Sequence, residues 1–129
     1  MRLGGSGTLD RCPKVKIILS HAGGFVPFAA YRIAGAASQK RNFADGIEQL
    51  KKFYFDIAIS GTPAALPSLL TLAQPDHVLF ATDWPYANDA IAGRFTSIYE
   101  GYTLSESQRA AIDRSNAEVL FPRLRGGLS

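Results

Sequence analysis

Two side chains of this sequence, His21 and Asp83, are of the types that bind metal ions and transfer protons. Each comes at the end of an apolar run that is typical of a buried strand. In folds with parallel strands, ligands and reacting groups gather at the carboxyl ends of the strands. The structural alternatives are a hydrogen-bonded histidine and an aspartate that caps a helix or forms a turn. Position alone therefore makes both residues candidates for a site.

Three apolar segments predict the strands that position these candidates. They run from Val15 to Leu19, from Phe53 to Ser60 and from His77 to Asp83. Gly23 and Gly24 follow the first segment and allow a sharp turn or the close approach of a ligand. Helical patterns fill the intervals, and strands that alternate with helices predict a parallel sheet with right-handed crossovers. The sequence therefore predicts an α/β fold.

Helices are predicted over residues 25–37, 44–52, 66–73 and 116–121, with more helix between the third strand and the last of them. The segment 66–73 has the apolar spacing of a helix that faces a core, and Pro67 fits its first turn. Overlapping capping-box patterns begin at Thr103 and at Ser105. The start of the helix that follows is therefore open between two registers.

Composition excludes several classes of protein. The chain has 129 residues, of which 47% are hydrophobic and 19% charged, as expected of one globular domain. Its net charge is only +3, and no basic run exceeds Lys51-Lys52, so we expect no nucleic-acid partner. The single Cys12 excludes a disulfide scaffold, and no segment approaches the roughly 20 apolar residues that span a bilayer. Because residues 1–7 also lack the apolar core of a signal peptide, we expect a cytoplasmic protein without a membrane partner.

The chain divides by composition into three segments. Residues 1–13 are predicted to be an irregular lead-in, because Gly4-Gly5-Ser6-Gly7 disfavours both helix and strand. Residues 14–122 hold all the predicted strands and the main helices, and residues 123–129 form a polar tail. Neither a P-loop pattern nor a G-x-G-x-x-G pattern after a strand is present, so nucleotide binding has no support.

Four motifs over residues 14–122 resemble, in the same order, segments of the amidohydrolase-2 family. They are Lys16 to Phe28 followed by Arg32, Phe53 to Asp56 followed by Ser60, Val78 to Pro85, and Asn116 to Phe121. The family contains metal-dependent hydrolases and nonoxidative decarboxylases of the aminocarboxymuconate-semialdehyde and resorcylate type. The resemblance implies that the three strands are the last three of a (β/α)₈ TIM barrel. The expected fold is thus a partial barrel of about three βα units plus C-terminal helices.

The resemblance also implies roles for individual residues. Asp83 would be a metal ligand, and His21 would be the catalytic histidine that activates metal-bound water or handles the substrate proton. In binuclear relatives His21 could itself bind metal. Arg32 would bind a substrate carboxylate, in some decarboxylases across a subunit interface, and Trp84 would line the pocket. Asp56 would support the site through hydrogen bonds. The implied cofactor is a divalent metal, with Zn²⁺ as the expected ion, and the implied partner is a small-molecule substrate.

The sequence departs from the family in its metal ligands. The His-x-His pair of the first strand and the mid-barrel metal histidine are absent, and His77, which precedes its strand, is predicted to be a surface or cap residue. A catalytic zinc takes three protein ligands, whereas this sequence offers one or two. We therefore expect the C-terminal part of a metal-dependent hydrolase or decarboxylase for a small carboxylate or cyclic substrate. We expect this part to be inactive alone, with a missing N-terminal half or a homo-oligomer completing it.

Two other functions stay open from the sequence. One is a non-catalytic, truncated homologue that acts by association with a partner subunit, since three strands leave two sheet edges unpaired. The other is a phosphatase-like domain with Asp83 as the nucleophile. That domain is disfavoured because it would want a second carboxylate two residues later, where Pro85 stands.

Overall fold

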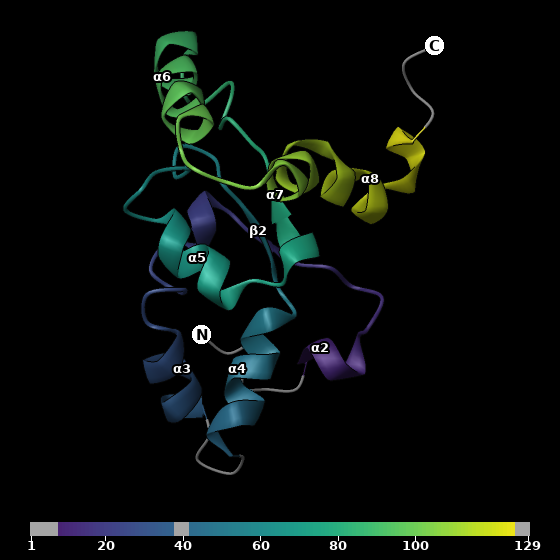
Figure 1. Ribbon diagram of the computed structural model, residues 1–129. Coiled ribbons are helices and arrows are strands. Elements are labelled where there is room, and N and C mark those ends of the chain that lie inside the picture. Colours follow the sequence, from purple (N-terminus) through teal and green to yellow (C-terminus); the bar gives the residue numbers. More distant parts are fainter. Residues whose placement is uncertain (1–7, 38–41, 126–129) are drawn as a thin grey trace.

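A computed structural model describes residues 8–37 and 42–125 of the chain (Figure 1). Its centre is one parallel sheet with the strand order β1-β2-β3. The strands are Ile18–Leu19 (β1), Tyr54–Asp56 (β2) and Val78–Leu79 (β3). The predicted α/β fold with three parallel strands is therefore confirmed.

The register of the sheet brings the three strand ends to one edge. Leu19 pairs with Phe55, and Asp56 pairs with Leu79. Backbone hydrogen bonds continue the ladder on both sides, from Tyr54 N to Ile17 O at 2.9 Å and from Ile57 N to Leu79 O at 3.0 Å. The segments that follow the three strands therefore begin next to one another at the same edge of the sheet.

The strands are shorter than the sequence predicts. The chain leaves β2 after Asp56 and forms a turn in which Ile59 has a φ of +40°, so the expected strand through Ser60 is wrong. The aromatic and β-branched pattern continues beyond Asp56, but Ile57 and Ala58 are buried by the turn rather than by a longer strand. An alternating apolar pattern indicates which side chains are buried, and a buried turn can have the same pattern as a strand.

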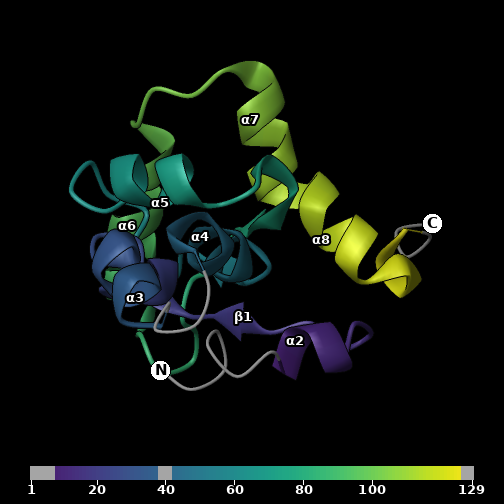
Figure 2. The same ribbon diagram turned by 90° about the horizontal axis from the view of Figure 1, so that it is seen from below.

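The helices surround the sheet and are connected to it by short turns. They are Thr8–Arg11 (α2), Ala30–Ala37 (α3), Phe43–Lys51 (α4), Leu66–Leu72 (α5), Asp89–Glu100 (α6), Glu106–Ala110 (α7) and Asn116–Leu120 (α8). The shorter turns are His21–Gly23 (η1), Pro75–His77 (η2), the π-helical Ala111–Ser115 (η3) and Pro122–Leu124 (η4). Figures 1 and 2 show α3 and α4 side by side at one end of the molecule, while α7 and α8 form a continuous arm on another side. No helix within the described ranges is long and apolar enough to cross a membrane.

Local sequence signals explain where several helices begin. Pro67 lies in the first turn of α5, as predicted, where its missing N–H leaves no acceptor unpaired. Ser105 is the residue that caps α7: its Oγ accepts from Gln108 N at 3.1 Å, and Gln108 Oε1 accepts from Ser105 N at 3.0 Å. This capping box settles the choice between the two registers in favour of Ser105. The first predicted helix begins at Ala30 rather than at Phe25, because turns occupy the residues before it.

The core lies between the sheet and the helices. Its largest fully buried side chains are Leu50, Phe53, Phe55, Leu66, Leu69 and Val78. Asn116, at the start of α8, is buried and donates from Nδ2 to Val78 O at 2.8 Å and to Pro75 O at 2.9 Å. These bonds attach the C-terminal helices to β3.

The lead-in segment differs from the expectation of an irregular chain. Residues 1–7 lie outside the described residues, but Thr8–Arg11 forms the one-turn helix α2. Leu9 in this turn is buried against the core, and Asp10 accepts from Gln49 Nε2 at 3.0 Å and pairs with Lys52. The contacts to α4 supply the order that the local sequence does not predict. Of the predicted tail, residues 123–124 belong to η4, which begins at Pro122, and residues 126–129 lie outside the described part.

The close approach of α3 and α4 gives a test of this packing. A Cβ at Gly46 of α4 would lie 2.9 Å from Ala34 Cα and Cβ, whereas a Cβ at Gly93 of α6 would meet nothing within 4 Å. We expect Gly46→Ala to lower the free energy of unfolding by about 1–3 kcal/mol through overpacking. Gly93→Ala, the matched control, should raise it by about 0.4–1 kcal/mol because alanine restricts the unfolded chain. Urea unfolding followed by circular dichroism measures both; equal effects would contradict the helix contact.

Candidate active site

His21 lies in a tight turn directly after β1. His21 and Ala22 both have left-handed backbone, with φ of +55° and +56°, and Gly23 and Gly24 follow with φ of +74° and +57°. Gly23 is required here, because a Cβ would also lie 2.9 Å from the Phe55 ring of β2. The run of four positive φ values reverses the chain at the carboxyl edge of the sheet. It thereby holds the imidazole at this edge.

The imidazole of His21 faces Asp83. His21 Nε2 lies 4.0 Å from Asp83 Oδ1, beyond the range of a direct hydrogen bond. The two side chains are 44% and 26% exposed, so both can be reached from solvent. The other ring nitrogen, Nδ1, lies 3.0 Å from Ala58 O in the turn after β2. The structure therefore brings the two candidates together, as the sequence predicts for side chains at neighbouring strand ends.

Asp83 lies in the loop that follows β3. Its φ is +67°, and its backbone oxygen accepts from Ala87 N at 2.8 Å. This turn directs the carboxylate back across the sheet edge towards His21. The side chain of Asp83 receives no hydrogen bond from the described residues, so its oxygens are available to a cation or a proton donor.

Asp56, the last residue of β2, lies between these two strand ends in the sheet. Its Oδ1 accepts two backbone hydrogen bonds, from His21 N at 2.9 Å and from Ala58 N at 3.1 Å. Asp56 therefore makes hydrogen bonds beside His21, as expected, and its role in supporting an active site stays a prediction. The functional group that sequence reasoning missed is the carbonyl of Ala58, because a backbone acceptor has no signal in the residue types.

Comparison with known proteins identifies the family. A family profile described as "Amidohydrolase" matches residues 3–123, which is nearly all of the chain. The chain belongs to the amidohydrolase family. The resemblance seen in the four motifs is thus confirmed.

The relatives of this chain include decarboxylases. It is 44% identical over 127 residues to 6-methylsalicylic acid decarboxylase from Penicillium expansum, in an alignment that covers 94% of this chain and 39% of the relative. The solved structure of an amidohydrolase II superposes with a TM-score of 0.81 at 30% identity, covering 91% of this chain and 38% of that one. A dihydroxybenzoic acid decarboxylase from Polaromonas sp. JS666, solved with bound manganese and the inhibitor 2-nitroresorcinol, gives a TM-score of 0.78 at 29% identity and covers 97% and 39%.

The fold of the chain is a partial (β/α)₈ TIM barrel, as predicted. The chain spans about two fifths of the length of the relatives and structures that it matches. The parallel order β1-β2-β3 corresponds to consecutive strands of such a barrel. The shared edge with His21 and Asp83 is the carboxyl end, where TIM-barrel enzymes place their active sites.

Trp84 and Arg32, the other two predicted site residues, are exposed. Trp84 follows Asp83 directly and is 68% exposed, so its ring is free to contact a ligand at the same edge. Arg32 lies on the solvent face of α3 and makes no hydrogen bond or ion pair with a described residue. Among the described residues, the guanidinium of Arg32 therefore has no hydrogen-bond or ion-pair partner, and neither His21 nor Asp83 contacts it through such a bond.

The side chains at the site can bind a divalent metal, but they do not form a complete set of ligands. An imidazole nitrogen and a carboxylate oxygen are ligands for ions such as Mn²⁺ and Zn²⁺. Within residues 8–37 and 42–125, no group of three or more His, Cys, Asp or Glu side chains gathers around a possible ion. The described part of the chain therefore offers two metal-binding atoms, His21 Nε2 and Asp83 Oδ1, and further ligands would have to come from elsewhere.

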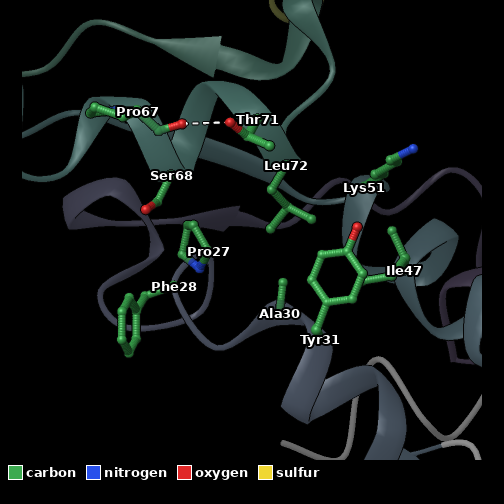
Figure 3. Close-up of a pocket in the computed structure, with 10 residues that line it drawn as sticks. All are labelled: Pro27, Phe28, Ala30, Tyr31, Ile47, Lys51, Pro67, Ser68, Thr71 and Leu72. Atoms are coloured by element: carbon green, nitrogen blue, oxygen red, sulfur yellow. Dashed lines mark hydrogen bonds between the residues drawn. The ribbon is translucent and has the colours of Figure 1, made fainter.

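A separate cavity of about 390 Å³ opens on the outer side of the sheet, between α3, α4 and α5 (Figure 3). Tyr31 from α3 and Leu72 from α5 face it, and Lys51 lies at its rim. Two of the polar groups here already have partners, since Thr71 Oγ1 donates to Pro67 O at 2.8 Å and Lys51 Nζ pairs with Glu48 at 2.8 Å. Neither His21 nor Asp83 lines this cavity, so it is not the site of the predicted chemistry.

His77 has a structural role at the opposite end of the sheet. Its Nδ1 lies 3.1 Å from both Lys51 O and Phe53 O, and its ring stacks on Tyr54 at 4.0 Å. The prediction of a cap is confirmed, because Lys51 ends α4, but the surface position is wrong: the side chain is only 18% exposed. Burial, together with the nearby Asp76 carboxylate, raises the pKa of Tyr54 above its ordinary value.

The two histidines should respond differently to the same substitution. His77→Asn removes a largely buried ring that stacks on Tyr54 and weakens its bonds to two backbone carbonyls, so we expect a loss of about 1–3 kcal/mol in the free energy of unfolding. His21→Asn should cost less than about 1 kcal/mol, because the ring is half exposed and asparagine tolerates left-handed backbone. Urea denaturation of both variants compares the values. A larger loss for His21→Asn would make His21 a structural residue.

Proposed function

We propose that this chain forms one wall of the active site in a metal-dependent decarboxylase for a small aromatic carboxylate. The observation that carries the proposal is the juxtaposition of His21 Nε2 and Asp83 Oδ1 at the carboxyl edge of parallel strands. The similarity of the chain to decarboxylases of 6-methylsalicylic acid and dihydroxybenzoic acid supports decarboxylation as the reaction. The chain would be the C-terminal part of a barrel whose other strands supply the remaining ligands.

A carboxylate such as Asp83 would hold the metal, with His21 as a second ligand or as a proton carrier beside it. When bound, a divalent ion supplies positive charge that polarises a substrate oxygen. The similar dihydroxybenzoic acid decarboxylase was solved with bound manganese, so Mn²⁺ is the first ion to test and the expected Zn²⁺ is the second. Oxygen donors such as Asp83 suit Mn²⁺, while imidazole suits both ions.

His21 would deliver the proton that replaces the carboxyl group. A proton held at Nε2 can pass to the ring carbon of the substrate while the C–C bond breaks and its electron pair remains on that carbon. Carbon dioxide then leaves, and His21 keeps the hydrogen on Nδ1 that it donates to Ala58 O. Imidazole is the side chain best matched to proton transfer near neutral pH.

Arg32 and Trp84 would recognise the substrate. The exposed indole of Trp84, adjacent to Asp83, would pack against an aromatic ring held at the metal. The guanidinium of Arg32 would bind a carboxylate with two parallel hydrogen bonds, in its own subunit or across a subunit interface. The absence of a protein partner for Arg32 among the described residues supports a ligand from outside the chain.

The alternative of a non-catalytic homologue that acts through a partner subunit stays a prediction, which sizing of the purified chain would test.

The proposed roles predict the effect of replacing His21 and Asp83 by asparagine. In the longest natural polypeptide that carries this chain, His21→Asn and Asp83→Asn should each lower kcat for decarboxylation of 6-methylsalicylate by a factor of about 10² or more. Chromatographic loss of the substrate and release of carbon dioxide measure the rate. Asp76→Asn is the matched control, because its 72% exposed carboxylate lies at the far end of the sheet, and it should retain activity. Wild-type rates in either site variant would contradict the assignment.

Metal dependence gives a separate prediction. Dialysis of the same polypeptide against a chelator should abolish decarboxylation, and Mn²⁺ should restore it, with Zn²⁺ tested in parallel. Asp83→Asn should lower the bound metal per chain, since a neutral amide oxygen is a weaker ligand than a carboxylate. Elemental analysis of the purified proteins gives the metal content. Full activity after verified removal of metal would overturn the metal-dependent reaction.

A further inference from the structure

The turn that carries His21 is tied to β2 by one carboxylate oxygen. A residue other than glycine seldom adopts left-handed backbone, and such positions persist where the surroundings fix them. Two backbone bonds close the turn itself, from Gly23 N to Ser20 O and from Gly24 N to His21 O, and the backbone N–H of His21 donates to Asp56 Oδ1 at 2.9 Å. The contact joins positions 35 residues apart in the sequence, so it depends on the pairing of β1 with β2.

The same oxygen also orders the next turn. Asp56 Oδ1 accepts from Ala58 N at 3.1 Å, which closes a short turn within the segment that leaves β2. This turn fixes the peptide whose carbonyl, Ala58 O, lies 3.0 Å from His21 Nδ1. One carboxylate therefore holds both the backbone of the histidine and the acceptor that its ring meets.

The ring contact decides which nitrogen of His21 carries hydrogen. A carbonyl oxygen only accepts, so Nδ1 must be the donor in the bond to Ala58 O. In the neutral imidazole the other nitrogen, Nε2, then holds the lone pair. Nε2 is the nitrogen that faces Asp83 at 4.0 Å, so two acceptor atoms point towards one space.

We propose that Asp56 is a positioning residue that selects the Nδ1–H tautomer of His21 by holding the Ala58 carbonyl against its ring. The selection leaves the Nε2 lone pair at the site, where it can receive a proton or a cation. The opposite tautomer would place hydrogen on Nε2, so that Nε2 could not accept a proton or bind a cation. The catalytic consequence rests on the proposed function, but the tautomer itself is a property of the folded chain.

The chain contains its own reference for this measurement. It has two histidines, and His77 Nδ1 also donates to backbone carbonyls, those of Lys51 and Phe53. No hydrogen bond links His77 to Asp56. Loss of the Asp56 carboxylate should therefore change the tautomer of His21 and leave that of His77 unchanged.

Long-range ¹H–¹⁵N correlation spectra of the 129-residue chain, recorded about two pH units above the ordinary imidazole pKa of about 6.5, test the proposal. We expect both histidines of the wild-type chain to show the Nδ1–H pattern. Asp56→Ala should turn His21 into a mixture of tautomers, while His77 keeps its pattern and reports that the chain is folded. Asp56→Asn keeps an acceptor oxygen in the same place and should restore the wild-type pattern at His21.

Several results would overturn the proposal. An Nε2–H pattern at His21 in the wild-type chain would do so directly, as would an unchanged His21 pattern in folded Asp56→Ala. If Asp56→Ala proves unfolded by its His77 signal, the Asp56→Asn spectrum decides, and loss of the Nδ1–H pattern there overturns the proposal. Because the readout needs neither metal nor substrate, failure of the decarboxylase assignment would leave this result intact.

Discussion

The candidate site depends on the parallel register of three short strands. Because β1, β2 and β3 run in the same direction with Leu19 beside Phe55 and Asp56 beside Leu79, the chain leaves all three at one edge. A slip of one residue would send the side chains of a strand to the opposite face of the sheet. The observed register instead brings the turn of His21, the carboxylate of Asp56 and the loop of Asp83 together.

Few residues pair directly in this sheet, so the helices must hold its register. Phe53 and Phe55 are fully buried in one cluster with Leu50 of α4 and Leu66 of α5, which packs one face of β2 and the residue before it against helices. At β3, Asn116 binds Val78 O, and Phe80 N donates to Ile112 O in η3, so helical segments satisfy backbone groups that a neighbouring strand would otherwise pair. Burial and helix-to-strand hydrogen bonds thus support a site that the short strands alone could not position.

Membership of the amidohydrolase family gives the site its chemical context. The relatives are more than twice as long as this chain, and within the described residues the site offers two donor atoms for a metal. The structural similarity nonetheless extends over more than nine tenths of this chain. The strand ends and their turns therefore have the arrangement of the family even where the other barrel strands are not part of the chain.

The sequence by itself determined the three parallel strands, the helix at α5 and the two candidates His21 and Asp83, because apolar runs and the residues that end them are local signals. It did not determine where β2 ends, why Leu9 is buried or how deeply His77 lies, since each depends on contacts with distant segments. Only the tertiary structure decided which nitrogen of His21 faces Asp83. That choice is made by a backbone carbonyl, which every residue carries, and its position is set by strand pairing across the sheet.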